Sequence, residues 1–481
     1  MAADKSHLRN SAPQKGLDFA GDYHFPYLHL INHMGEGVDS ATHGENIIHL
    51  AVEFNIYESI YDSSVSGSVV IVDTQNLIAK LPIQGTERLS FIITTKLSND
   101  DEETVIDCRE SQGKEMHVFS VTDKQQLNDN TLTYTIHFAS REFVRNLRTR
   151  VSESFSGRMD QMVNKIFTDP DYLDSHKTLN FQQTRNQDKI VIPNLNPFSA
   201  IRMICKRSLP EIERSRGAGY LFYETTKGFH FRSFESLCVT KSGEQVKAKQ
   251  KFRYIYVPVD RFGHEVLDDE GKKLDKIMEG FQSVEQYRFL NNFHDVAANT
   301  MLGTYGHTVI THNLYSKSYK KDKYHYHNSF NKTAHTDTDP DRRYKGGPAI
   351  TDSPVDYDQV EGNAYKQKGV SDFTESRISL TPTSQFVHNE GTGNYGVDVV
   401  QDGKIEGERI ALANSVRAGT KLQMTVKGQS WLQSGDVIEF DVQSVENRDN
   451  SGGRPDSRYS GRYIITDIRH QVSNDEYIPV S

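Results

Sequence analysis

The chain has 481 residues and a formal net charge of −9, with 56 Lys and Arg against 65 Asp and Glu. Its length predicts about two to four domains. Its acidic balance argues against a general affinity for nucleic-acid phosphates. The only cysteines, Cys108, Cys205 and Cys238, are widely spaced, so we expect buried thiols rather than a disulfide framework or a Cys-x-x-Cys metal site.

The clearest strand pattern lies between Ile47 and Thr95. Apolar side chains fall at every second position of its first part: Ile48, Leu50, Val52, Phe54 and Ile56. This period of two predicts a half-buried strand with those side chains in a core. Further strands are expected at five segments: Val69–Val72, Phe91–Thr95, Val105–Cys108, Met116–Val121 and Thr131–Phe138. The first domain is therefore expected to end near Ser140.

The spacing then becomes helical. Met159, Met162, Val163, Ile166 and Phe167 follow the i, i+3, i+4 pattern of an amphipathic helix. We expect Ser156 to cap this helix and Asp169–Pro170 to end it. A second helix is predicted to begin at Asn196–Pro197, with a capping side chain before a proline at the first helical position.

The second half begins with a hairpin signal at Gly219–Phe234, two aromatic strands around a short polar turn. Residues 241–376 are interpreted as an insertion that ends in a long polar loop. Strand and helix signals return in five segments: Arg377–Leu380, the helix Glu408–Arg417, Lys421–Lys427, Val437–Val442 and Tyr463–Ile468.

Histidines are the first candidates for chemistry. Four lie near the start, and two more lie in the segment Tyr324–His327: His29, His33, His43, His49, His325 and His327. The His-x-His pair would place both rings on one face of a strand, but no cysteine or carboxylate accompanies it at a recognisable spacing. Polar surface residues are the better interpretation, and we expect no metal site and no cofactor.

Other motifs point no more strongly to catalysis. Gly391–Gly396 matches G-x-G-x-x-G by letters, but it neither follows a strand nor opens an apolar helix, so a loop is favoured over a phosphate site. Asp268–Asp269 lies in a charged turn. The basic run Lys317–Lys323, with Tyr315, Tyr319 and Tyr324, could contact nucleic acid, although a solvated rim or a protein interface is favoured. We expect no enzyme and assign no catalytic, cofactor-binding or metal-binding residue.

Three groups of segments resemble the baseplate hub proteins of contractile-tailed bacteriophages. Ile56–Ile60, Gly67–Asp73 and Leu81–Leu89 are similar to their first tube-like domain, and Ile190–Arg207 is similar to their small α/β domain. The C-terminal segments resemble the second tube-like domain and also the spike proteins of type VI secretion systems: Met424–Gln429, Ser434–Phe440 and Ser460–His470.

This resemblance implies a mainly β chain with α+β parts. Two tube-protein-like antiparallel β-barrel domains would be joined by a small α/β domain and an inserted domain. The expected boundaries are 1–140 for the first barrel with an N-terminal extension, 141–215 for the α/β domain, 216–240 with 377–481 for the second barrel, and 241–376 for the insertion.

The function that the resemblance implies is structural. Three copies would form a ring that joins the sixfold tail tube to the threefold central spike and lets DNA pass without specific binding. The expected partners are the spike protein and the tube protein or its first-ring adaptor, with the tape measure protein and baseplate wedge left open. The protein would be assembled in the host cytoplasm and located in the virion tail, without membrane insertion. A tail-tip cell-wall hydrolase and a receptor- or carbohydrate-binding β protein remain alternatives.

Overall fold

The computed structural model describes most of the chain, and the descriptions that follow refer to these residues. They are 20–38, 43–81, 83–95, 105–211, 219–239, 254–256, 280–291, 296–313, 317–329, 335–336, 370–383, 387–389, 394–396, 403–442, 456, 459–473 and 477–480. The fold is mainly β, as expected, with several antiparallel sheets. No described helix is long and apolar enough to span a membrane.

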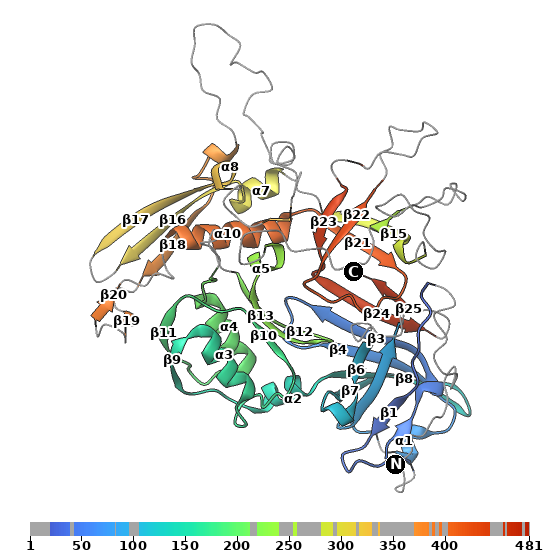
Figure 1. Cartoon of the computed structure of the whole chain (residues 1–481). Coiled ribbons are helices and arrows are strands. Elements are labelled where there is room, and N and C mark those ends of the chain that lie inside the picture. Colours follow the sequence, from blue (N-terminus) through green and yellow to red (C-terminus); the bar gives the residue numbers. More distant parts are fainter. Residues whose placement is uncertain are drawn as a thin grey trace, which may run out of the picture.

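A twelve-stranded sheet dominates the molecule (Figure 1). Eight of its strands come from the N-terminal part: β1 Leu28–Ile31, β2 Glu45–Asn46, β3 Ala51–Ser59, β4 Ser66–Asp73, β5 Arg88–Thr94, β6 Val105–Cys108, β7 Met116–Asn128 and β8 Thr131–Ser140. Short helices link some of them: η1 Ile48–Leu50, α1 Leu77–Lys80 and η3 Glu110–Gln112. We call these elements the N-terminal β unit, and the predicted strands are all present in it.

The core of this unit explains its strand pattern, with two corrections. Ile48 and Leu50, predicted to lie in the strand, form the 3-10 helix η1, and β3 begins only at Ala51. Phe54 and Ile56 of β3 are buried, and Gly67 of β4 passes so close to Phe138 that an added Cβ would lie 2.2 Å from its ring. Val52, however, is 42% exposed. A shift in the β3–β4 register between Ala51 and Glu53 breaks the alternation there, so the prediction that Val52 faces the core is wrong.

The other four strands of the large sheet form the C-terminal β unit. They are β15 Val284–Asn291, β21 Lys421–Val426, β24 Asp467–Ser473 and β25 Tyr477–Val480. A small sheet packs with them, made of β14 Tyr254–Ile255, β22 Val437–Asp441 and β23 Gly461–Ile464. Phe281, Trp431 and Phe440 lie in the core that the two sheets share. The single strand predicted at Tyr463–Ile468 is thus two strands, and β15 of the expected insertion belongs to this unit.

A third unit, the α/β unit, follows the first in the chain. Its elements are α2 Arg141–Arg148, β9 Ser154–Arg158, α3 Met159–Thr168, β10 Leu179–Phe181, β11 Gln187–Val191, α4 Pro197–Arg207, β12 Tyr220–Thr225, β13 Gly228–Ser233 and α5 Glu235–Cys238. Both predicted helices are present as α3 and α4. Helix α3 begins without a side-chain cap, because Ser156 lies within β9, so the expected cap there is wrong.

The hairpin β12–β13 corrects the expected second barrel. It pairs with β10 of the α/β unit, with Leu179 opposite Phe229, and not with the C-terminal strands. Its aromatic side chains Phe222, Phe229 and Phe231 share a core with α3 and α4. Strands with aromatic side chains on both faces can pack in the α/β unit or beside the C-terminal strands. The pairing with β10 places this hairpin in the α/β unit.

Helix α4 receives its N-terminal cap from another helix. The Asn146 side chain of α2 accepts the Phe198 N–H at 2.8 Å, whereas Asn196, the expected cap, makes no side-chain capping bond. We therefore expect Asn146→Ala to lower the free energy of unfolding by about 1–2 kcal/mol, because a buried N–H loses its acceptor. Asn196→Ala is the matched control, with an expected loss below about 0.5 kcal/mol. Urea unfolding of both variants checks this, and equal losses would contradict it.

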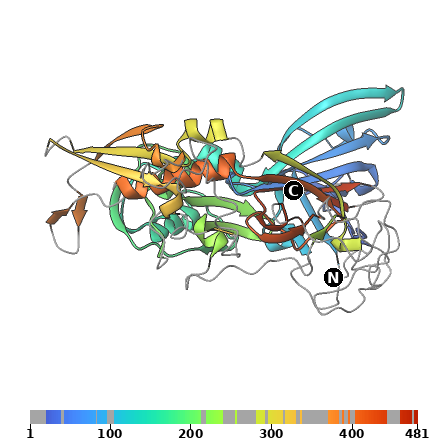
Figure 2. The ribbon, with the colours of Figure 1, turned by 90° about the horizontal axis from the view of Figure 1, so that it is seen from above.

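The last unit is a small sheet beside a long helix. The sheet consists of β16 Gly306–Asn313, β17 Ser318–His325 and β18 Ile378–Thr383 in the order β17-β16-β18. The helices near it are α7 Val296–Leu302, α8 Tyr326–Ser329, η7 Val370–Asp372 and α10 Gly403–Ala418, and a hairpin is formed by β19 Val387–Asn389 and β20 Asn394–Gly396. Figure 2 shows α10 running along this sheet, so the predicted helix Glu408–Arg417 and the strand at Arg377–Leu380 pack in one layered unit.

Candidate functional site: the junction of the β units

The two β units meet along one pair of strands. Residues Asp467–Ser473 of β24 pair antiparallel with Ser59–Glu53 of β3, so sequence segments about 410 residues apart form one continuous sheet (Figure 1). Ile60 extends the junction, since its N–H donates to the carbonyl of Thr466 at 2.9 Å. Both strands would otherwise expose backbone donors and acceptors, which the pairing satisfies.

Polar side chains cross this junction on one face of the sheet. Arg469 donates from Nε to Asn55 Oδ1 at 2.9 Å and from a terminal nitrogen to Glu53 Oε1 at 2.7 Å. Gln471 donates to the same Glu53 oxygen at 3.3 Å. The guanidinium also lies 5.9 Å from the Tyr57 ring centroid. These contacts favour one register of β24 on β3, because a shift by one residue would move every partner to the opposite face.

Beneath the junction, Glu58 ties three units together. Its side chain is 2% exposed and accepts the N–H of Thr226 at 2.7 Å and that of Ser434 at 3.0 Å. Thr226 belongs to the turn of the β12–β13 hairpin, and Ser434 precedes β22. Burial raises the pKa of Glu58, although the two backbone donors oppose this rise. One carboxyl group on β3 therefore holds the α/β unit and the C-terminal β unit in place.

A second buried cluster lies within the α/β unit and contacts the N-terminal β unit through Val65. Lys177 Nζ lies 3.0 Å from Glu142 Oε2 and 2.7 Å from Glu224 Oε1, with both carboxylates only 2% exposed. The remaining carboxylate oxygens are also bonded, since Ser175 donates to Glu142 at 2.6 Å and the Val65 N–H donates to Glu224 at 2.9 Å. Every polar atom of this triad has a partner, as buried charges require.

The pKa shifts follow this geometry. Burial opposes the charge on Lys177, but Glu224 and Glu142 outweigh it and raise its pKa. Burial also opposes the charge on Glu142, yet Lys177 and Ser175 hold its pKa below the ordinary value. For Glu224 burial prevails and its pKa is raised. Lys177 is accordingly a charged structural group rather than a neutral amine available as a nucleophile.

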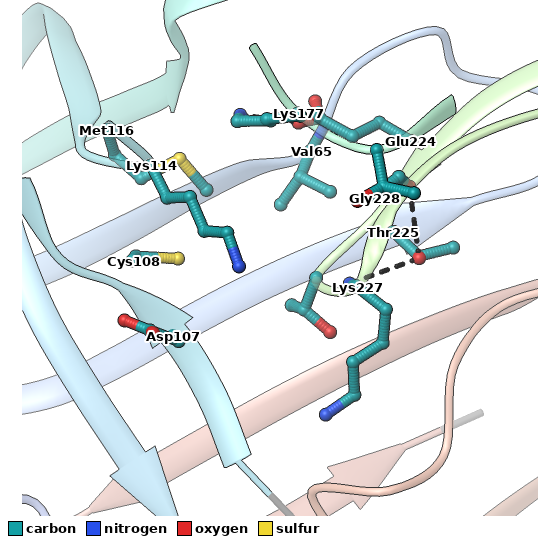
Figure 3. A pocket seen from close by; sticks show the side chains of 12 residues that line it. Val65, Asp107, Cys108, Lys114, Met116, Lys177, Glu224, Thr225, Lys227 and Gly228 are labelled. Atoms are coloured by element: carbon teal, nitrogen blue, oxygen red, sulfur yellow. Dashed lines mark hydrogen bonds and ion pairs between the residues drawn. The ribbon is translucent and has the colours of Figure 1, made fainter. Parts of the chain in front are cut away.

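A narrow hollow opens beside the triad, between the N-terminal β unit and the β12–β13 turn (Figure 3). Lys227 lines it and donates from Nζ to the carbonyl of Val105. The lining side chains come from both units: Val65, Asp107, Cys108, Lys114, Met116, Lys177, Thr178 and Glu224–Gly228. Several residues that line the hollow are bonded across it by hydrogen bonds or ion pairs. The hollow is therefore part of the contact between the two units.

The loop before β22 closes the junction from the other side. Gly435 adopts φ +91°, and an added Cβ would lie 2.4 Å from the Tyr223 hydroxyl. Its N–H donates to the carbonyl of Ile465 at 2.8 Å. Ile60, Tyr223 and Leu237 form a small apolar cluster at the same place. The Gly-Asp-Val-Ile segment of the sequence thus owes its glycine to the close approach of the α/β unit.

The three cysteines are free thiols and buried, as expected. Burial raises the pKa of each thiol to about 12. A triple Cys→Ala variant is expected to fold, because these side chains act only in packing. Maleimide labelling followed by mass spectrometry checks this: the wild-type chain should react only after denaturation. Labelling of the native protein within minutes would contradict the burial.

The candidate histidines whose side chains the structure describes do not share a site. His43 Nε2 lies 2.5 Å from Glu110, and His325 Nε2 lies 3.1 Å from Asp372. Within the described part of the chain, no three His, Cys, Asp or Glu side chains are grouped as metal ligands. Asp268–Asp269, Tyr315 and Gly391–Thr392–Gly393 lie outside the described residues, while Asn394–Gly396 forms β20 of a hairpin rather than a loop.

The residues of the junction were missed by the sequence analysis, although a signal existed. Glu58 continues the buried alternation of Phe54 and Ile56, and Glu224 stands in the aromatic run of the hairpin. A carboxylate at a buried position of a strand requires a hydrogen-bond donor or a cation as its partner. That donor could not be named in advance, because Lys177 and the N–H groups come from other parts of the chain.

No protein-family model and no curated protein matches this sequence. Solved structures are similar to it along most of its length. The tail protein from Neisseria meningitidis MC58 has 9% identity and a TM-score of 0.48, covering 95% of this chain and 95% of that chain. The 43 kDa tail protein of prophage MuSo2 from Shewanella oneidensis has 9% identity and a TM-score of 0.47, covering 94% and 96%.

A third similar structure comes from a secretion system. It is an E. coli component of the type VI secretion system, described as structurally similar to the T4 bacteriophage tail proteins gp27 and gp5. It has 9% identity and a TM-score of 0.35, and the match covers 89% of this chain and 72% of that chain. The solved structures to which this chain is similar thus include phage tail proteins and a type VI secretion component.

Proposed function

We propose that the protein is a structural subunit of a contractile phage tail and forms the central hub of its baseplate. The observation that carries this proposal is the pairing of β3 with β24, which places two β units edge to edge within one chain. A ring subunit that presents two related units in succession requires such a lateral contact. The segments that resemble the hub family, Ile56–Ile60 and Ser460–His470, lie at this contact.

In this proposal each β unit is a tube-like barrel. The first comprises β1–β8, and the second comprises β14, β15 and β21–β25, a revision of the boundaries expected from sequence. Three chains would close a ring of six units, with about sixty degrees between neighbours, alternately within and between chains. Such a ring would meet a sixfold tube on one face and a threefold spike on the other. DNA would pass through it without specific binding.

The buried charges at the junction are consistent with this structural role. Glu58 fixes the N-terminal β unit to the α/β unit and to the C-terminal β unit, and the Val65 N–H of the N-terminal β unit binds Glu224 of the buried triad. A buried carboxylate with directed donors favours one arrangement of the units over alternatives. A hub needs a fixed relative orientation of its two barrels, because the contacts around the ring depend on it.

Solution mass and electron microscopy of the hub with its tube protein test the proposal. We expect a complex with three copies of the 54.7 kDa chain and sixfold-like density on the face that meets the tube. A stable monomer bound to a single spike chain would contradict it. A ring with any number of copies other than three would also contradict it, even with both barrels present.

A further inference from the structure

The large sheet contains a run of eight strands that are all antiparallel to their neighbours, in the order β15-β21-β25-β24-β3-β4-β8-β7. The C-terminal β unit contributes the first four strands and the N-terminal β unit the last four. Because directions alternate, β15 and β3 stand first in their units and point the same way, and β24 and β7 stand last and point the opposite way. The contact of β24 with β3 thus joins the last strand of one unit to the first strand of the next.

At one end of this run, β7 has a free edge. Beyond Val118, whose N–H donates to the carbonyl of Glu87, β7 pairs with β8 alone within the described part of the chain. Residues Asp123–Asn128 are all exposed, among them Leu127, which is 57% exposed. Figure 2 shows the β7–β8 hairpin, in cyan, projecting beyond the rest of the sheet. This edge presents backbone donors and acceptors that a further strand could pair with.

At the other end, β15 pairs in the large sheet with β21 alone, again among the described residues. It has eight residues, and its Leu290 is 53% exposed. Register shifts interrupt β15 at Glu285 and Leu290, and they interrupt β7 at Asp123–Lys124 and at Leu127. Bulges on an edge strand discourage pairing with arbitrary strands, so each edge is selective for a partner that fits it.

The charges on the two edges are complementary in antiparallel order. On β7, Asp123 precedes Lys124, and on β15, Glu285 precedes Arg288. Asp123, Lys124 and Arg288 are exposed and form no ion pair with any described residue. In an antiparallel pair Glu285 lies toward Lys124, and Arg288 lies toward Asp123. A parallel pair would instead bring like charges toward one another, which is unfavourable.

We infer that the free edge of β7 pairs antiparallel with the free edge of β15 in a second copy of this chain. The inference rests on the proposed ring and names the contact that closes it. Rotation about a ring axis keeps the direction of a strand along that axis, so β15 of the next copy meets β7 as β3 meets β24 within the chain. The contact is heterologous, since each chain gives β7 to one neighbour and β15 to the other.

Two variants of the full chain, each blocked at one edge, test this inference. Lys124→Glu with Leu127→Pro blocks β7, and Arg288→Glu with Leu290→Pro blocks β15. Both leucines lie outside the paired registers, so proline removes few hydrogen bonds within the sheet. Sedimentation velocity gives the number of copies. We expect three for the wild type, one for either blocked chain alone, and two for their equimolar mixture, which retains one usable edge of each kind.

The matched control is Lys323→Glu with Ile378→Pro, which makes the same kinds of change in the sheet β17-β16-β18. Ile378 is 55% exposed, and the Thr308 N–H donates to the carbonyl of Arg377 at 2.9 Å, so the N–H of Ile378 points away from β16. This variant should form the ring of three copies. Thermal unfolding followed by circular dichroism should be unchanged in all three variants.

The outcomes separate this inference from the proposed ring. Three copies from either blocked chain would overturn the inference and leave the ring, because other surfaces would then close it. Two copies from one blocked chain alone would show that like edges pair, and would also overturn it. So would a mixture that stays at one copy while both blocked chains melt as the wild type does. A wild-type chain that stays monomeric would overturn the ring itself, and the inference with it.

Discussion

Replacing Lys177 with methionine is expected to lower the free energy of unfolding by about 3–5 kcal/mol. The substitution leaves Glu142 and Glu224 buried without a cation. Urea unfolding measures the loss. Lys165→Met is the matched control, because Lys165 pairs with Glu153 at 2.9 Å but is 49% exposed, and its loss should stay below about 1 kcal/mol.

The loss in Lys177→Met should depend on pH. Without the cation, burial raises the pKa of both carboxyl groups in the folded state, so folding takes up protons. The folded state of the variant is then stabilised as the pH falls through these raised pKa values, and the difference from wild type shrinks between about pH 8 and pH 5. Adding Glu142→Gln and Glu224→Gln should recover part of the loss at about pH 8. A pH-independent difference would show that packing, and not charge, is responsible.

Phe54→Asp is expected to prevent recovery of soluble protein. Phe54 is 2% exposed, and its ring centroid lies 4.9 Å from that of Phe91, 5.3 Å from that of Phe25 and 5.4 Å from that of Phe138. Loss of this aromatic contact alone costs about 3–5 kcal/mol, and an unpaired buried carboxylate adds to it. The measurement is soluble yield, followed by thermal unfolding of any soluble fraction.

Val52→Asp is the control for this prediction, on the same strand and two residues away. Val52 is 42% exposed because of the irregular register beside it, so a carboxylate there reaches solvent and should cost less than about 1 kcal/mol. Equal loss of soluble protein in both variants would mean that the alternation of β3 is not interrupted at Ala51–Glu53. A soluble Phe54→Asp variant would contradict the core assignment.

The local structure of much of this chain can be predicted from its residue pattern. Alternation in Thr131–Phe138 predicts β8, with Tyr134, Ile136 and Phe138 fully buried, and helical spacing predicts α3 and α4. The end of α3 at Thr168 also follows from Asp169–Pro170. These predictions hold because the burial period of a strand or helix and the conformational limits of proline are properties of the local chain.

The pairing of the elements and the positions of the buried charges depend on long-range packing. The hairpin β12–β13 belongs with β10, and β24 lies on β3, yet backbone hydrogen bonds are nearly the same for any two strands, so strand sequence does not name the neighbour. For the same reason, the contacts of the junction could not be predicted from the sequence. Lys177, Glu142 and Glu224 lie up to 82 residues apart, and only the packing of α2 and β12 on a shared core brings their charges within hydrogen-bonding distance.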